Sequence, residues 1–190
     1  MATIKLENGL RKLKVAQIEE SGDYGAIITV ADLTQITAET SEGETKLPAG
    51  NYVIYSKKTK GQTNGSLGFY AMEDDSEKTL FGTKENADGN ILYGMKDEKR
   101  LVALIIEFTA VNPATNAEED GFIIFPKVSL GEISDDLATK DADGNETINA
   151  KSLSFSAMAL DNSNKTYKLK GFGNTPKQIT QAMFEPRQKG

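Results

Sequence analysis

The sequence predicts an all-β protein, a β-sandwich or barrel of about nine or ten strands with one short flanking α-helix. Short runs rich in β-branched and aromatic residues recur along the chain. Turn-forming Gly, Pro, Asn and Asp residues lie close together between these runs. A convincing helix pattern is present only in residues 73–82.

The strongest pair of strands is predicted in residues 99–130. Two apolar runs, 101–108 and 122–128, flank a polar insert that contains Asn, Pro and Gly. We therefore expect a long antiparallel hairpin at the centre of the fold. Residues 102–106 are all apolar, so both faces of this strand must be covered, either within the domain or by another subunit.

The elements before this hairpin follow in chain order. Polar and apolar residues alternate in 11–18, which predicts a first strand preceded by an N-terminal arm, residues 1–10. A second strand is predicted over 24–30. Residues 39–65 are polar and rich in turn formers, so they are predicted to be a long loop that contains one short strand, 51–55. Loops of this length in compact domains are usually functional or disordered.

The helix prediction in residues 73–82 is based on its two ends. Asp74 and Glu77 have the spacing of a capping box, and Gly82 is well placed as a C-terminal cap. The apolar residues before Gly82 would hold the helix against the sheet.

Further turns and strands are predicted towards the C-terminus. Asp-Gly pairs at 88–89 and 143–144 mark hairpin turns. Residues 152–159 alternate in polarity, and 166–172 would be their antiparallel partner. Thr-Pro at the start of 175–184 predicts a short C-terminal helix.

The composition of the 190 residues excludes several classes of function. The chain has neither Cys nor His, which excludes disulfides, thiolate metal sites and Ser-His or Cys-His catalysis. The net charge of −6 and the pI near 4.9 argue against nucleic-acid binding. No apolar run approaches the ~18 residues of a membrane span, and no secretion signal opens the chain.

Three clusters of charged residues are candidate functional sites. Residues 141–146 start like a calcium loop, but Gly144 and Ser152 do not match its pattern, so a hairpin turn is the better interpretation. The acids 118–120 are interpreted as a solvated loop rather than a catalytic pair. For the basic residues 57–60, a charge-paired subunit contact fits at least as well as a nucleic-acid patch. We expect no metal, no cofactor and no enzyme activity.

The order of several short motifs resembles the major tail proteins of long, flexible-tailed bacteriophages. These motifs are LPAGN at 47–51, TLFG at 79–82, ADGN at 87–90 and GFIIFPKV at 121–128. The resemblance covers residues 11–172 and implies a tail-tube β-sandwich domain, with a C-terminal arm over 173–190.

The resemblance implies a structural virion protein that assembles in the host cytoplasm into six-membered rings. These rings stack into a hollow tail tube through which DNA is ejected without specific binding. The further partners would be the tape-measure, terminator and baseplate proteins, with no membrane involved. The long loops 39–65 and 110–121 would contact neighbouring subunits. The candidate interface residues are Leu47, Tyr52, Tyr55, Lys57, Lys58, Asn112, Asn116 and Phe184, and the candidate lumen-facing acids are Glu39, Glu42 and Glu44.

Two alternatives remain open from the sequence. One is the tube subunit of a phage-derived bacteriocin or of a type VI secretion-like system. The other is a monomeric β-sandwich that acts as a binding or adhesion module.

Overall fold

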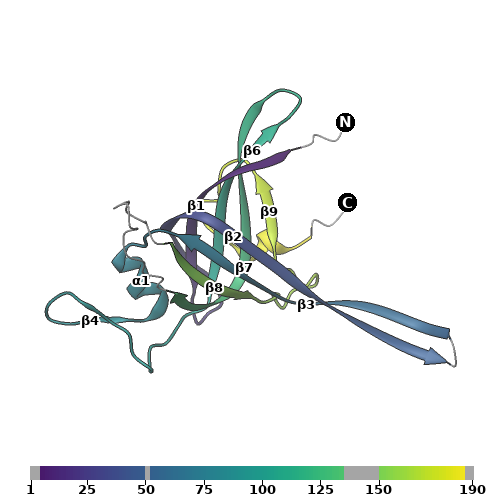
Figure 1. The fold of residues 1–190 in the computed structure, drawn as a ribbon, viewed down its shortest axis with the longest axis horizontal. Coiled ribbons are helices and arrows are strands. Elements are labelled where there is room, and N and C mark those ends of the chain that lie inside the picture. Colours follow the sequence, from purple (N-terminus) through teal and green to yellow (C-terminus); the bar gives the residue numbers. More distant parts are fainter. Residues whose placement is uncertain (1–4, 50–51, 135–149, 187–190) are drawn as a thin grey trace, which may run out of the picture.

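A computed structural model describes residues 5–49, 52–134 and 150–186 of the chain (Figure 1). Within these ranges there are nine strands, one α-helix and one 3-10 helix. They are β1 (Leu6–Ile18), β2 (Tyr24–Ala49), β3 (Tyr52–Phe69), α1 (Asp74–Phe81), β4 (Lys84–Glu85), β5 (Ile91–Leu92), β6 (Val102–Asn112), β7 (Ala117–Ser134), β8 (Lys151–Ala157), β9 (Leu169–Phe172) and η1 (Gln181–Phe184).

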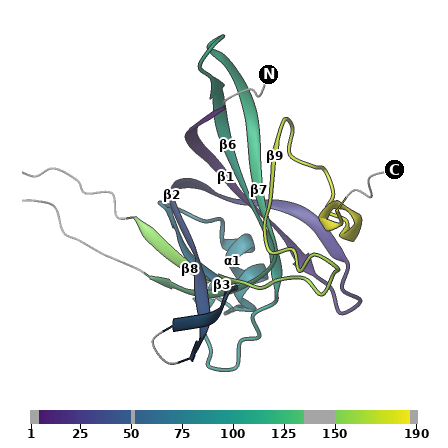
Figure 2. The ribbon, with the colours of Figure 1, turned by 90° about the vertical axis from the view of Figure 1, so that its right-hand side faces the viewer.

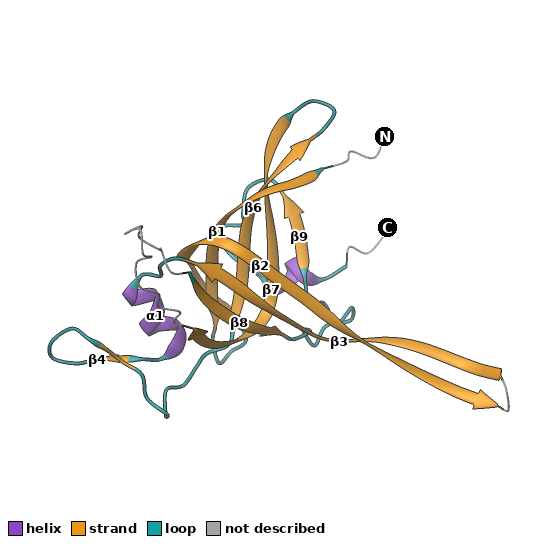
Figure 3. Ribbon diagram, viewed as in Figure 1, coloured by secondary structure: helices purple, strands orange, loops and turns teal. Residues whose placement is uncertain are grey.

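The main sheet nearly closes into a ring, as Figure 3 shows. Antiparallel pairing leads from β6 through β1, β2, β3 and β8 to β7, and β7 pairs back to β6. The short strand β9 adds to β7, while β4 and β5 form a separate two-stranded sheet. The predicted all-β class with one short helix is therefore confirmed, in its barrel form.

The predicted central hairpin is formed by β6 and β7, and both faces of β6 are covered within the chain. Leu104 and Ile106 belong to the core inside the ring, to which all six ring strands contribute. Ile105 points the other way and packs into a second cluster with Ile179 and Phe184 of the C-terminal segment. Figure 2 shows this yellow segment along one side of the sheet. The unbroken apolar pattern of β6 thus needs no second subunit to explain it.

Three glycines lie directly opposite a phenylalanine of the neighbouring strand. The pairs are Gly65 with Phe155, Gly121 with Phe108, and Gly171 with Phe122. In each pair the aromatic ring fills the space above the glycine, because a Cβ there would come within 2.6 Å of it. Aromatic side chains over strand glycines help to set the register of a sheet.

We expect Gly65→Ala to destabilise the protein by about 1–3 kcal/mol, because an added Cβ overpacks this site. The Cβ would lie 2.2 Å from the Thr37 carbonyl oxygen, a backbone atom that cannot turn aside. Gly25→Ala is the control, since its Cβ would lie 3.6 Å from its nearest neighbour. The urea midpoints of the two variants check this. Equal midpoints would contradict the packing explanation.

Helix α1 lies within the predicted stretch, and its C-terminal end is as predicted. Gly82 has a left-handed backbone with φ 68°, and its N–H bonds the Lys78 carbonyl. Leu80 and Phe81 are buried in the main core. The predicted capping box is wrong by one residue. The N-cap is Glu73 instead of Asp74, and its side chain makes no capping hydrogen bond.

Three predictions near the chain ends are corrected. Residues 6–10, predicted as part of an arm, belong to β1 and pair with β6. Residues 169–172 pair with β7 rather than with β8, because β8 already lies between β3 and β7. The predicted helix over 175–184 is limited to the 3-10 turn η1 within the described part of this segment. The turn predicted at 143–144 lies outside the described residues.

Both predicted long loops are mostly strand. Residues 39–49 and 52–65 pair with each other across β2 and β3, and only residues 113–116 separate β6 from β7. Because residues 39–65 are mostly polar, this pairing could not be predicted from the sequence. A hairpin with solvent on both faces has no alternation of apolar and polar residues, which is the usual signal for a strand.

Candidate assembly surfaces

The hairpin of β2 and β3 extends far beyond the barrel and forms an arm, which we define as residues 40–49 and 52–62. Strand β2 pairs with β1 only as far as Asp32, and β3 pairs with β8 only from Thr63 onwards. Beyond these points the two strands have only each other as described sheet partners. Ten residues of strand span about 35 Å, and Figure 1 shows the arm extending away from the rest of the molecule.

Large apolar side chains are exposed on both faces of the outer end of this arm. We call this group the arm tip: Leu47, Tyr52, Val53, Ile54 and Tyr55, which are 47–78% exposed. Leu47 is opposite Tyr55 in the register, so these two share one face, whereas Tyr52 and Ile54 alternate onto the other. Exposed apolar clusters of this kind mark surfaces that are covered in an assembly.

The part of the arm nearer the barrel carries paired charges. Glu42 is opposite Lys60 and Glu44 is opposite Lys58 in the register. The Lys46 ammonium lies 2.9 Å from the Glu44 carboxylate, and the Ser56 hydroxyl donates to the same group at 2.8 Å. These two contacts hold the pKa of Glu44 below its ordinary value.

The three acids predicted to face a lumen, Glu39, Glu42 and Glu44, are all exposed on β2. Residues 39–62 contain these three glutamates and four lysines. The arm is therefore not acidic as a whole, and these acids would not by themselves give a strongly negative lining. Two predicted interface lysines, Lys57 and Lys58, are exposed on β3 close to the arm tip.

The β4–β5 hairpin lies at the opposite end of the molecule from the arm (Figure 1), and a second exposed apolar group includes Leu92 of β5 and residues that follow it. Leu92 and Tyr93 are more than half exposed, and the Met95 side chain is fully exposed. Ile91, the residue before Leu92, lines a pocket of about 390 Å³ together with Glu73, Asp75, Lys78, Glu85 and Gly89. Leu92 pairs with Lys84 and alternates onto the other face of the two-stranded sheet. We call this pocket, together with Leu92, Tyr93 and Met95, the α1–β5 surface.

The Lys78 side chain bridges two carboxylates within the pocket of the α1–β5 surface. The Lys78 ammonium lies 2.9 Å from Asp75 and 2.6 Å from Glu85. The hydrogen bond and the charge of Lys78 lower the pKa of Asp75, and the two carboxylates raise that of Lys78. Three carboxylates and one lysine thus line this pocket, which leaves it an excess of negative charge.

The other predicted interface residues have structural roles within the chain. The Asn112 side chain accepts a hydrogen bond from the N–H of Ala114, and Asn116 has a φ of 52°, so both shape the β6–β7 turn. Phe184, also predicted at an interface, is 3% exposed within the chain, and its ring packs against Tyr24.

The acids 118–120 were expected in a solvated loop but lie in β7. Glu119 forms an ion pair with Lys5, and Asp120 forms one with Arg11. Both pairs connect β7 to the N-terminal segment across the hairpin.

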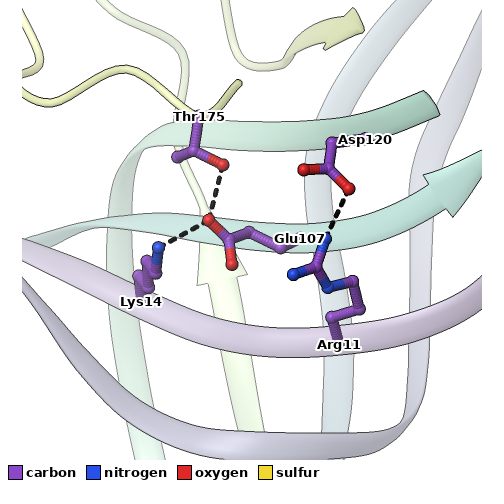
Figure 4. Close-up of polar contacts among 5 residues, drawn as sticks. All are labelled: Arg11, Lys14, Glu107, Asp120 and Thr175. Carbon is purple, nitrogen blue, oxygen red and sulfur yellow. Dashed lines mark hydrogen bonds and ion pairs between the residues drawn. The ribbon is translucent and has the colours of Figure 1, made fainter. Parts of the chain in front are cut away.

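Sequence reasoning missed a buried carboxylate, Glu107 on β6 (Figure 4). Its Oε1 accepts hydrogen bonds from the Lys14 ammonium at 2.6 Å and from the Thr175 hydroxyl at 2.5 Å. Burial by itself would raise the pKa of Glu107, but these two hydrogen bonds and the charges of Lys14 and Arg11 lower it below its ordinary value. The cluster therefore attaches the C-terminal segment to β1 and β6.

Because the folded-state pKa of Glu107 is lowered, its contribution to stability is present above the ordinary value of 4.5 and is lost as the pH falls through the folded-state pKa. We expect Glu107→Gln to cost about 1–3 kcal/mol at pH 7 and progressively less as the pH falls below 4.5 through the lowered pKa of Glu107. Urea unfolding of both proteins at several pH values checks this. A cost that does not change with pH would contradict it. Glu118→Gln, at an exposed position of β7, is the control.

The described residues contain no group of three or more acids suited to holding a metal ion. None of the helices within the described ranges is long and apolar enough to cross a membrane. The fold and its surfaces define a class, a barrel-like β protein with a long projecting arm. Comparison of the sequence with models of known protein families finds no match, and a search of curated proteins finds none either.

Proposed function

We propose that the chain is the subunit of a self-assembling tube, the tail tube of a long-tailed bacteriophage. Copies form hexameric rings, the rings stack, and DNA passes through the central channel on its way into the host. The protein then acts as a structural component of the virion, without enzyme activity or cofactor. The proposal combines the resemblance of the sequence motifs with the surfaces of the structure.

The arm is the observation that carries the proposal. Two-stranded hairpins are at best marginally stable in water on their own. This one also exposes five large apolar side chains and both outer edges along its outer part. Unpaired edges and exposed apolar groups favour association with another chain. An assembly of like subunits would cover the arm in every copy.

The overall charge supports passage of DNA without binding. The chain carries 28 acidic and 22 basic residues, and an acidic protein repels phosphates at long range. The tape-measure, terminator and baseplate proteins are the further partners that a tail tube requires.

Electron microscopy of the purified protein at high concentration, with its mass measured by light scattering, tests the proposal. We expect rings or hollow tubes with a central channel. A particle of one copy at every concentration would instead favour the monomeric binding module. In that case the arm would be the place to look for its ligand.

Hydrogen exchange provides a test with an internal control, because β3 is part arm and part barrel. We expect amides of residues 53–62 that bond to β2 to exchange faster than those of residues 64–69, which lie between β2 and β8. In the assembly the arm amides should slow by at least about tenfold, since a neighbour covers them. Equal protection of the arm in the isolated and assembled protein would contradict this.

A further inference from the structure

Among the described residues, the arm tip and the group Leu92, Tyr93 and Met95 are exposed apolar clusters. The arm and the β4–β5 hairpin lie at opposite ends of the molecule, so one copy cannot bring the two clusters together (Figure 1). We infer that the arm tip of one copy docks on the α1–β5 surface of a second copy. This inference rests on the proposed function, and it names the receiving surface for the arm.

The first support is that both surfaces leave large apolar side chains uncovered. The arm tip exposes two tyrosines, a leucine, a valine and an isoleucine. The α1–β5 surface exposes Leu92, Tyr93 and Met95, the last of these completely. Aromatic residues and methionine are enriched at the buried centres of protein interfaces. Contact between the two groups would remove both from water.

The second support is complementary charge. The arm contains four lysines and two acids, Glu42 and Glu44, and therefore carries a net positive charge. Residues 73–98, which contain α1, β4, β5 and Met95, contain eight acids and three lysines. The pocket itself has three carboxylates against Lys78 alone, so it can accept a further cation. Lys46, next to the tip, is paired with Glu44, and Lys57 and Lys58 follow the tip along β3. Complementary charges of this kind select the partner and its orientation.

The shape of the subunit supports a second copy as the occupant. Each copy has one arm and one receiving surface, and an arm of about 35 Å can reach well beyond its own barrel. A contact between two different patches of identical subunits is head-to-tail, and repeats of it generate rings or stacks. The same chain therefore provides both halves of the contact.

Charge reversal tests the docking in the full-length protein. The arm variant carries Lys57→Glu and Lys58→Glu. The receiving variant carries Glu73→Lys, in the pocket, and Asp88→Lys, next to Gly89 of the pocket in the turn between β4 and β5. All four positions are exposed. Each variant alone places like charges in every contact, so the concentration needed for assembly should rise at least about tenfold. Lys12→Glu with Lys177→Glu, also exposed, is the control for net charge.

The decisive measurement is light scattering of the two variants mixed in equal amounts. In the mixture a reversed arm can meet a reversed receiving surface, and a native arm can meet a native surface, so assembly should return. The docking is wrong if the native protein assembles and either variant alone assembles equally well. It is also wrong if the mixture of the two variants does not recover assembly. Both outcomes leave the proposed tube function intact. If the native protein itself never assembles, the proposed function fails first.

Discussion

Replacement of Leu104 by Asp is expected to abolish folding of the chain and, with it, any assembly. Leu104 is fully buried in β6, opposite Val15 of β1 and Phe125 of β7. The substitution removes an apolar side chain from the core and places an unpaired carboxylate there. Together these changes cost more than about 5 kcal/mol, comparable with the whole stability of a typical domain. Ile106→Asp, equally buried, should behave in the same way.

Soluble yield and circular dichroism measure this result. Leu47→Asp is the matched control, because the same substitution is made at a leucine that is 53% exposed on the arm. That variant should fold normally and lose only assembly. A soluble Leu104→Asp protein with a native spectrum would mean that β6 is not the central core strand.

Removal of the arm is expected to abolish assembly and leave the barrel folded. Thr40 and Thr63 are opposite each other in the register, and their hydroxyls lie 2.8 Å apart. An Asn-Gly turn that joins these two residues would close the hairpin at the edge of the barrel. None of the described buried residues lies in the arm, so its removal takes nothing from the core. We therefore expect the free energy of unfolding to change by less than about 1 kcal/mol.

The shortened protein should remain monomeric at concentrations at which the native protein forms tubes. A second variant keeps the arm at full length but replaces the five arm-tip residues with Thr, which retains a high strand propensity. If this variant assembles while the shortened one does not, the length of the arm matters and its apolar tip does not. If the shortened protein forms tubes at the concentrations at which the native protein does, the arm is not required for assembly.

Some parts of the fold could be predicted because their local signals are strong. The β6–β7 hairpin consists of two long apolar runs around a turn, and α1 ends at a glycine that adopts a left-handed backbone. The arm could not be predicted in the same way. Its residues are exposed on both faces, so the alternation that reveals a half-buried strand is absent, and its polar residues resemble those of a loop.

The candidate surfaces were predictable only in part. Tyr52, Tyr55, Lys57 and Lys58 are exposed near the end of the arm, as an interface requires. The α1–β5 surface had no signal in the sequence, because exposed apolar residues are identified only once the fold is known. The burial of Phe184 had no local signal either, because its ring packs against Tyr24, a residue distant in the chain.

By itself the sequence determined the β class, the central hairpin, the short helix and the absence of Cys and His chemistry, because these depend on composition and on neighbouring residues. The tertiary structure decided what covers β6, where the arm leaves the barrel and which surfaces remain exposed. Glu107 is the clearest case. Its partners Lys14 and Thr175 lie 93 and 68 residues away in the chain, and only the folded chain brings their hydrogen-bond donors to one carboxylate.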